Sequence, residues 1–226
     1  MILEGDCLAV MPTLQSVDCI ITDPPYGISY LSGYQTQNNR SPGAVGRRSM
    51  PFFDRIHGDE SLPLRWIPLA YSVLKDSSAI YVYAHWKNWG TLSKNLTSAG
   101  FKVKNMIVLN KSNWGMGDLK GSYAPKHELL CYAVKGKHKL NVPPRLSDVW
   151  DVPVLYSGST RLHPNQKRLE WITPAILQST QPGDTILDPF AGSGSTGEAC
   201  VATGRKFILI ERDPKYVQVC RDRLAC

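Results

Sequence analysis

The chain has 226 residues, of which 42% are hydrophobic and 20% are charged, and its formal net charge is +7. This length and composition suit a single soluble α/β domain over residues 1–226 that buries its own core. No apolar run reaches the roughly 18 residues of a transmembrane helix, so we expect no membrane partner. The positive charge favours a polyanionic partner but does not prove one.

Six cysteines are spread along the chain without a CxxC pair or a Cys/His spacing typical of a zinc site. We interpret them as reduced thiols of a cytoplasmic protein, and we expect no metal. The first residues, MILEGDCLAVM, lack the basic and apolar regions of a signal peptide, which agrees with that location.

Apolar, β-branched runs alternate with helical patterns along most of the chain. Strands are predicted at Asp18–Asp23, Ala79–Ala84, Asn105–Lys111, His127–Lys135, Asp184–Asp188 and Phe207–Glu211. Helices are predicted at Leu62–Lys75, Trp86–Ala99, Lys167–Thr180, Glu198–Thr203 and Pro214–Leu224. The alternation predicts an α/β, Rossmann-like fold, in which a mostly parallel twisted sheet carries helices on both faces.

Two segments interrupt this alternation. Residues Leu31–Asp59 are rich in Gly, Ser and Asn and show no periodicity, which predicts a mobile loop inserted into the domain. Residues Gly136–His163 also look irregular. Both segments carry basic side chains, which a polyanionic partner would favour.

The stretch TDPPYG ends the first predicted strand in an acid, two prolines and an aromatic ring. Pro24 and Pro25 fix the backbone and remove two N–H donors, which leaves a rigid group of oxygen acceptors. Such a group suits a planar substrate with an exocyclic amino group. Asp23 and the Pro24 carbonyl would hold the two amino protons, and the ring would stack on Tyr26.

A glycine-rich turn follows the strand that ends at Asp188. Gly192, Gly194 and Gly197 match GxGxxG between a strand and a helix, and Glu211 lies 19 positions after Gly192, where an acid can hold a ribose. Asp188 would repel a pyrophosphate and attract a cation. The turn therefore favours S-adenosylmethionine, which has a ribose and a sulfonium but no phosphate, over a dinucleotide.

DPPY and DPFAGSGSTG, in this order, resemble the catalytic and cofactor motifs of the β-class S-adenosylmethionine-dependent DNA amino-methyltransferases. These enzymes methylate adenine N6 or cytosine N4. The stretches LEGDCLAVM, DVWDVP and HPNQKRLEWITPAIL are also similar to segments of that family, so the resemblance extends over most of the chain. Arg168 departs from the family pattern, which often has a proline there, and we expect little consequence.

The resemblance implies a site for each part of the reaction. The catalytic residues would be Asp23, Pro24, Pro25 and Tyr26. Cofactor contacts would come from Asp6, His163, Asn165, Gln166, Lys167, Asp188, Pro189, Phe190, Ala191, Gly192, Ser193, Gly194, Ser195, Thr196, Glu211 and Arg212. Phosphate contacts would come from Arg47, Arg48, Lys111, Lys120, Lys126, Lys137 and Lys139, with residues 136–163 as a short target-recognition segment.

The expected partner is double-stranded DNA, in a bacterial, phage or prophage setting. The resemblance also implies a homodimer, and a partner restriction enzyme stays open because lone and paired methyltransferases look alike in sequence. We favour adenine N6 as the target over cytosine N4. Two alternatives are less favoured. RNA or protein-amide methyltransferases usually place the cofactor motif before the catalytic one, and the intact acids and glycines of both motifs argue against an inactive DNA-binding module.

Overall fold

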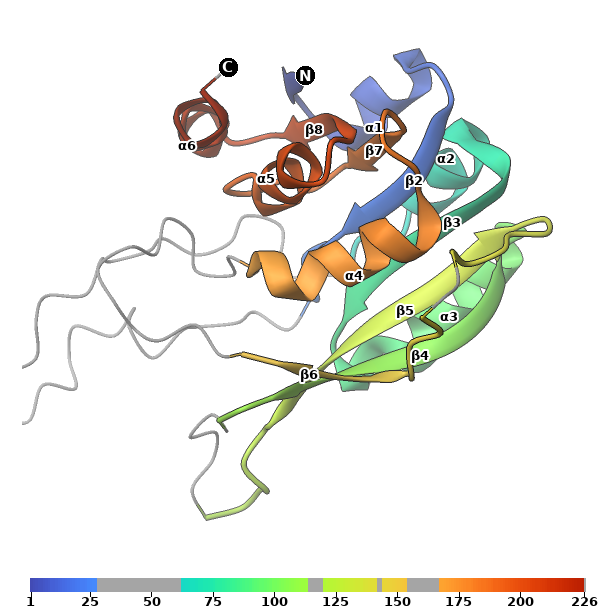
Figure 1. Ribbon diagram of the computed structural model, residues 1–226, viewed down its shortest axis with the longest axis vertical. Helices are drawn as coiled ribbons and strands as arrows, with labels where there is room; N and C mark the ends of the chain where they lie inside the picture. The colour runs from blue at the N-terminus through green and yellow to red at the C-terminus, as the bar shows by residue number, and fades with distance from the viewer. Residues whose placement is uncertain (28–61, 114–119, 142–143, 154–166, 226) are drawn as a thin grey trace, which may run out of the picture.

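An eight-stranded sheet forms the centre of the part of the chain that the computed structural model describes, which is residues 1–27, 62–113, 120–141, 144–153 and 167–225. The strand order is β1-β8-β7-β2-β3-β5-β4-β6 (Figure 1). The strands are β1 (Ile2–Glu4), β2 (Val17–Thr22), β3 (Leu74–Ala84), β4 (Lys102–Lys111), β5 (His127–Lys135), β6 (Val149–Val152), β7 (Thr185–Asp188) and β8 (Lys206–Glu211).

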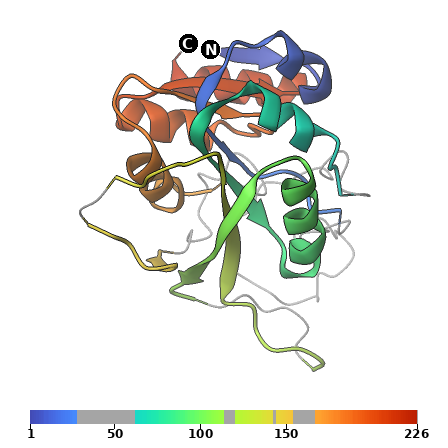
Figure 2. The same ribbon diagram turned by 90° about the vertical axis from the view of Figure 1, so that its right-hand side faces the viewer.

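Helices cover both faces of this sheet (Figures 1 and 2). The α-helices are α1 (Cys7–Val10), α2 (Trp66–Val73), α3 (Trp89–Ser98), α4 (Leu169–Ser179), α5 (Ser195–Ala202) and α6 (Pro214–Leu224). Two short 3-10 helices, η1 (Met11–Thr13) and η3 (Trp86–Asn88), accompany them. None of the helices in these residues is both long and apolar enough to cross a membrane.

Strand direction brings particular chain ends to one end of the sheet. Strands β1, β8, β7, β2 and β3 pair in parallel, and β4 pairs in parallel with β6, whereas β5 is antiparallel to both β3 and β4. The predicted mostly parallel α/β fold is therefore confirmed. The carboxyl ends of β2, β3, β4 and β7 lie at the same end of the sheet as the amino end of β5.

Alternating side chains of the strands separate the core into two layers. Ile20 packs in the layer that holds Trp66 and Leu96, on the side of helices α1, α2 and α3. Its neighbours on β2, Cys19 and Ile21, pack in the layer of α4 and α5. This alternation is what a sheet covered on both faces requires.

Two predicted boundaries are wrong near the start of β3. The helix predicted to reach Lys75 ends at Val73, and β3 begins at Leu74 instead of Ala79. Leu74 pairs with Val17 of β2, and Lys75 Nζ lies 2.6 Å from Asp18 Oδ1. Pairing with the neighbouring strand therefore decides the conformation of residues whose local pattern continues a helix.

Strands β1 and β6 were not predicted. The three residues of β1 are too few to show a period, and they pair with β8. Strand β6 lies inside the segment predicted to be irregular, and it extends the sheet beside β4. The predicted loop at Leu31–Asp59 lies outside the described residues.

Gly197 lies where α5 packs against β8 and α6. A Cβ atom at this position would lie 2.8 Å from Leu209 Cδ1 and 2.8 Å from Leu224 Cδ1. We expect Gly197→Ala to lower the free energy of unfolding by about 1–3 kcal/mol, measured by urea denaturation.

Gly90 of α3 provides the control, because a Cβ atom there meets nothing within 4 Å. Helix propensity should make Gly90→Ala neutral or stabilising by up to about 1 kcal/mol. Equal losses in the two variants would contradict the packing argument.

Candidate active site

The two motifs meet at the carboxyl ends of adjacent strands. Strands β2 and β7 pair in parallel, so Thr22 and Asp188 end side by side. Thr22 Oγ1 donates a hydrogen bond of 2.8 Å to Asp188 Oδ1. Asp23 and Asp188 line a single cavity of about 980 Å³. The catalytic and cofactor motifs, which lie far apart in sequence, therefore share one site.

Most of the residues predicted to bind the cofactor line this cavity. Among the described residues of that set, every one lines it except Gly194. His163, Asn165 and Gln166 lie outside the described residues. Asp23, Pro24 and Pro25 also line the cavity. Tyr26 does not line it, but its hydroxyl donates a hydrogen bond to Asp23.

Asp188 accepts three hydrogen bonds, one of which comes from the strand that carries the catalytic motif. Besides the bond from Thr22, its Oδ1 accepts from the Phe190 backbone N–H at 3.1 Å, and its Oδ2 accepts from Thr196 Oγ1 at 2.6 Å. Burial raises the pKa of Asp188 to about 6, although these three donors oppose the shift. The carboxylate is thus held rigidly and ionised at some cost, which a cation in the cavity would offset.

The glycine turn and Glu211 form the other wall of the cavity. Gly194 has φ 79°, a conformation that glycine adopts without strain, and it caps the amino end of α5. Glu211 Oε2 accepts the Gly192 N–H at 2.8 Å, and Oε1 accepts the Asp213 N–H at 2.8 Å. Each Glu211 oxygen keeps a second lone pair, so the carboxylate can also accept from a ribose diol.

The cavity suits the predicted cofactor in its charges and in its apolar wall. The Trp66 and Phe190 rings meet edge to face, with centroids 5.6 Å apart, and provide apolar wall for a planar group. Glu211 suits the ribose, and the ionised Asp188 suits a positive sulfonium or ammonium. The chemistry of these donors and acceptors matches S-adenosylmethionine.

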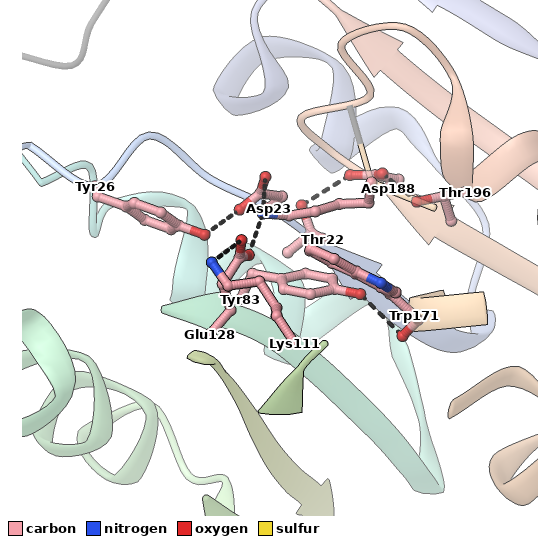
Figure 3. A network of polar contacts seen from close by, with 10 residues as sticks. Thr22, Asp23, Tyr26, Tyr83, Lys111, Glu128, Trp171, Asp188 and Thr196 are labelled. Carbon is pink, nitrogen blue, oxygen red and sulfur yellow. Dashed lines mark hydrogen bonds and ion pairs between the residues drawn. The ribbon is translucent and has the colours of Figure 1, made fainter. Parts of the chain in front are cut away.

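A buried network of charges surrounds Asp23 (Figure 3). The Tyr26 hydroxyl donates to Asp23 Oδ1 at 2.5 Å, and Lys167 Nζ lies 3.1 Å from Asp23 Oδ2. The same Nζ donates to Glu128 Oε2 at 2.8 Å, and Lys111 Nζ lies 3.7 Å from Glu128 Oε1. Acidic and basic side chains therefore alternate from the catalytic turn to the start of β5 and the end of β4.

Aromatic rings enclose the ammonium group of Lys167. Its Nζ lies 4.7 Å from the centre of the Tyr83 ring, 5.9 Å from that of Trp171 and 6.0 Å from that of Tyr26. Burial alone would lower the pKa of Lys167, but the carboxylates of Asp23 and Glu128 outweigh burial and raise it. The group is therefore a permanent cation in an apolar enclosure.

Asp23 and Glu128 respond differently to the same cation. Burial raises the pKa of Asp23, and Lys167 and the Tyr26 hydroxyl limit the rise. For Glu128, burial also acts to raise the pKa, but Lys167 and Lys111 together hold it below its ordinary value. Glu128 was not predicted as a site residue.

The basic residues predicted to contact DNA lie in different parts of the molecule. Lys120 and Lys126 lie on the connection between β4 and β5, which leaves the sheet at the end where Asp23 lies, and Lys111 is largely buried beside Glu128. Lys137 and Lys139 follow β5 at the opposite end of the sheet. The described structure therefore does not bring Lys137 and Lys139 to this site. Arg47 and Arg48 lie outside the described residues.

Within the residues that the structure describes, no three or more His, Cys, Asp or Glu side chains are grouped so that they could hold a metal ion. The five described cysteines are buried free thiols, spread over the core.

Residues 17–222 match the DNA methylase family. The chain belongs to this family. The methylase is 30% identical to the type II methyltransferase M2.MboI of Moraxella bovis over 98% of its own length and 86% of that protein. It is 29% identical to the type II methyltransferase M.HinfI of Haemophilus influenzae, over 99% of this chain and 67% of the relative.

Solved structures show the same fold. The M1.HpyAVI–SAM complex superposes with a TM-score of 0.73 at 25% identity, covering 99% of this chain and 98% of that one. PvuII DNA methyltransferase, which is cytosine-N4-specific, superposes with a TM-score of 0.74 at 16% identity, over 98% and 85% of the two chains. The family expected from the motifs, the S-adenosylmethionine-dependent DNA amino-methyltransferases, is confirmed.

Proposed function

We propose that this DNA methylase transfers a methyl group from S-adenosylmethionine to N6 of an adenine that is rotated out of duplex DNA. The observation that carries the proposal is that Asp23 and Pro24 line the same cavity as Asp188 and Glu211. One wall offers acceptors for an amino group, and the other offers acceptors for a ribose and a cation.

The acceptors at the catalytic turn suit an aromatic amine. Asp23 Oδ1 accepts from Tyr26 and Oδ2 from Lys167, so each oxygen keeps a lone pair for an amino proton. Pro24 and Pro25 carry no N–H that would compete for these acceptors. Hydrogen bonds from the amino protons to acceptors favour a pyramidal nitrogen, whose lone pair is then free to form the new N–C bond.

The donor and the base contribute complementary parts of the reaction. When bound, S-adenosylmethionine supplies a methyl carbon whose bond to sulfur breaks, with the electron pair staying on sulfur. Asp23 takes the proton that the amino nitrogen loses. Asp188 and Glu211 orient the donor, so that positioning and electrostatics supply the catalysis and no cysteine serves as a nucleophile.

A base inside a duplex cannot reach these acceptors, so it must leave the stack. The Asn88 side-chain amide donates a hydrogen bond to the Tyr26 carbonyl oxygen, which anchors the catalytic turn to η3. Adenine is the target that we favour from the sequence, and cytosine N4 is the alternative. Lys120 and Lys126 are suited to hold the DNA backbone beside the site. The homodimer remains a prediction.

The direct test is to express the protein in a bacterium that lacks DNA methylation. Single-molecule sequencing should then show N6-methyladenine in a fixed sequence context, and chromatography of the nucleosides should confirm the modified base. N4-methylcytosine alone would overturn the choice of adenine. An absence of modified bases, with purified protein that also fails to methylate DNA, would overturn the proposed activity of this chain.

A further inference from the structure

We propose that Lys167 and Glu128 are positioning residues for the reaction: Glu128 holds the Lys167 ammonium against Asp23, and Lys167 keeps Asp23 ionised and oriented toward the substrate. The proposal deepens the proposed function, because it concerns how the Asp23 acceptor is made. It also reassigns Lys167 from the cofactor, where the motif placed it, to the catalytic turn.

The contacts of Lys167 determine this role. Its Nζ spans two carboxylates, with Asp23 Oδ2 at 3.1 Å and Glu128 Oε2 at 2.8 Å. These acids come from the end of β2 and the start of β5, and Lys167 lies two residues before the first residue of α4. Only an antiparallel β5 brings the start of that strand to this end of the sheet, so the fold itself assembles the triad.

The aromatic enclosure makes the interaction strong and directional. Tyr83 donates its hydroxyl hydrogen bond to the Trp171 carbonyl at 3.0 Å, which fixes the ring that lies 4.7 Å from Lys167 Nζ. The side chain of Lys167 is 10% exposed. Water therefore screens its charge little, and an ammonium held among rings and two carboxylates has few other positions to adopt.

The groups that face Asp23 come from every neighbouring element. Lys167 faces it from the start of α4, Glu128 from β5, Tyr83 from β3, Asp188 from β7 and Tyr26 from its own turn. Of these, only Lys167 is a cation. Lys111 touches Glu128 at 3.7 Å and compensates that acid instead.

This geometry gives opposite expectations for the two partners. Lys167→Met removes the cation beside Asp23, so the carboxyl should titrate at higher pH than in the wild type. Glu128→Gln keeps an oxygen for Lys167 but removes a neighbouring negative charge, so Asp23 should titrate at lower pH. A role limited to holding the fold predicts no such opposed displacement.

Carbon-13 NMR of protein labelled at the aspartate carboxyl tests the inference without DNA or cofactor. The Asp23 signal is assigned by its loss in Asp23→Asn, and its titration is followed in the wild type and both variants. Lys111→Met is the matched control, because it removes a cation that touches Glu128 but not Asp23, and its displacement should be much smaller than that of Lys167→Met. Absence of the opposed displacements in folded variants would overturn the proposal.

Methyl transfer tests the catalytic consequence. We expect kcat for Lys167→Met to fall on the order of 10- to 100-fold, with its acid limb moved to higher pH, because a misplaced acceptor slows an otherwise intact site. Lys167→Arg should recover part of the loss, since it keeps the charge. The affinity for S-adenosylmethionine, measured by calorimetry, should stay within about 3-fold of the wild type.

The results separate the inference from the proposed function. If the Asp23 titration moves in opposite directions in the two variants but the wild type methylates no DNA, the inferred charge network stands and the proposed activity is wrong. An active wild type whose Lys167→Met variant loses mainly cofactor affinity would return Lys167 to the cofactor and overturn the inference.

Discussion

Replacing Asp23 by alanine is expected to lower methyl transfer to DNA by about 1,000-fold or more while cofactor affinity changes little. The variant loses an anionic acceptor that is fixed inside the cavity. A water molecule in its place would carry no charge and would not be held in position. Burial already raises the pKa of Asp23, so its charge is maintained by Lys167 and Tyr26, and no other described carboxylate occupies the catalytic turn. The loss should therefore fall on kcat.

Transfer of tritiated methyl groups to DNA measures this loss, and calorimetry with S-adenosylmethionine measures the affinity. Asp23→Asn is the matched control, because it keeps an oxygen acceptor and loses the charge. We expect it to retain more activity than alanine and less than the wild type. Undiminished transfer by the alanine variant would exclude Asp23 from catalysis.

The fold class was predictable because periodicity and turn chemistry are local. The run HELLCYAVK forms β5 with the predicted bounds, and Pro214–Leu224 forms α6 as predicted, with Asp213 as its cap and Pro214 at its start. Where local pattern and strand pairing disagree, as at Leu74, pairing decides. Strand β1 pairs with β8, and its three residues carry no readable period.

The candidate site was predictable where the residue types of a short motif indicate the chemistry. Asp23 and Asp188 each follow a buried strand, and parallel strands bring such ends together. Their contact through Thr22 agrees with that expectation. The assignment of individual residues to catalysis or to cofactor binding remains a prediction.

Glu128 could not be predicted, because its place depends on the direction of β5. A sequence shows that a strand begins at His127, but not whether that beginning lies beside the end of β2 or at the opposite end of the sheet. The same uncertainty made Lys137 and Lys139 appear equivalent to Lys120 and Lys126. Strand order and direction, which are non-local, decide which charges surround the site.

Asp188→Ala is expected to weaken cofactor binding about 100-fold, which corresponds to about 3 kcal/mol of binding free energy. Alanine removes the acceptor of three hydrogen bonds, which come from Thr22, Phe190 and Thr196, and it removes the negative charge. Asp188→Asn is the sharper variant. Its oxygen can serve Thr22 and Phe190, and its amide can donate to the Thr196 hydroxyl, so the geometry persists without the charge.

The raised pKa of Asp188 determines how the stability of the folded protein changes with pH. The folded-state pKa is about 6 and the ordinary value is 3.8, so ionisation costs the folded protein about 3 kcal/mol. Stability from this group is fully present below about pH 3.8 and is lost as pH rises through about 6. Asp188→Asn should therefore make the cofactor-free protein at least as stable as the wild type at pH 7.5, while it binds the cofactor less tightly.

A positively charged cofactor must favour the ionised form of Asp188 if the two interact. Wild-type affinity for S-adenosylmethionine should therefore rise as pH increases through about 6, and binding below that pH should release a proton. Calorimetry between pH 5 and 8, in two buffers of different ionisation enthalpy, measures both effects. Asp188→Asn should abolish them, and S-adenosylhomocysteine, which lacks the sulfonium charge, should show a weaker dependence. A pH-independent affinity in the wild type would mean that Asp188 holds the fold together at Thr22 and Thr196 without sensing the charge of the donor.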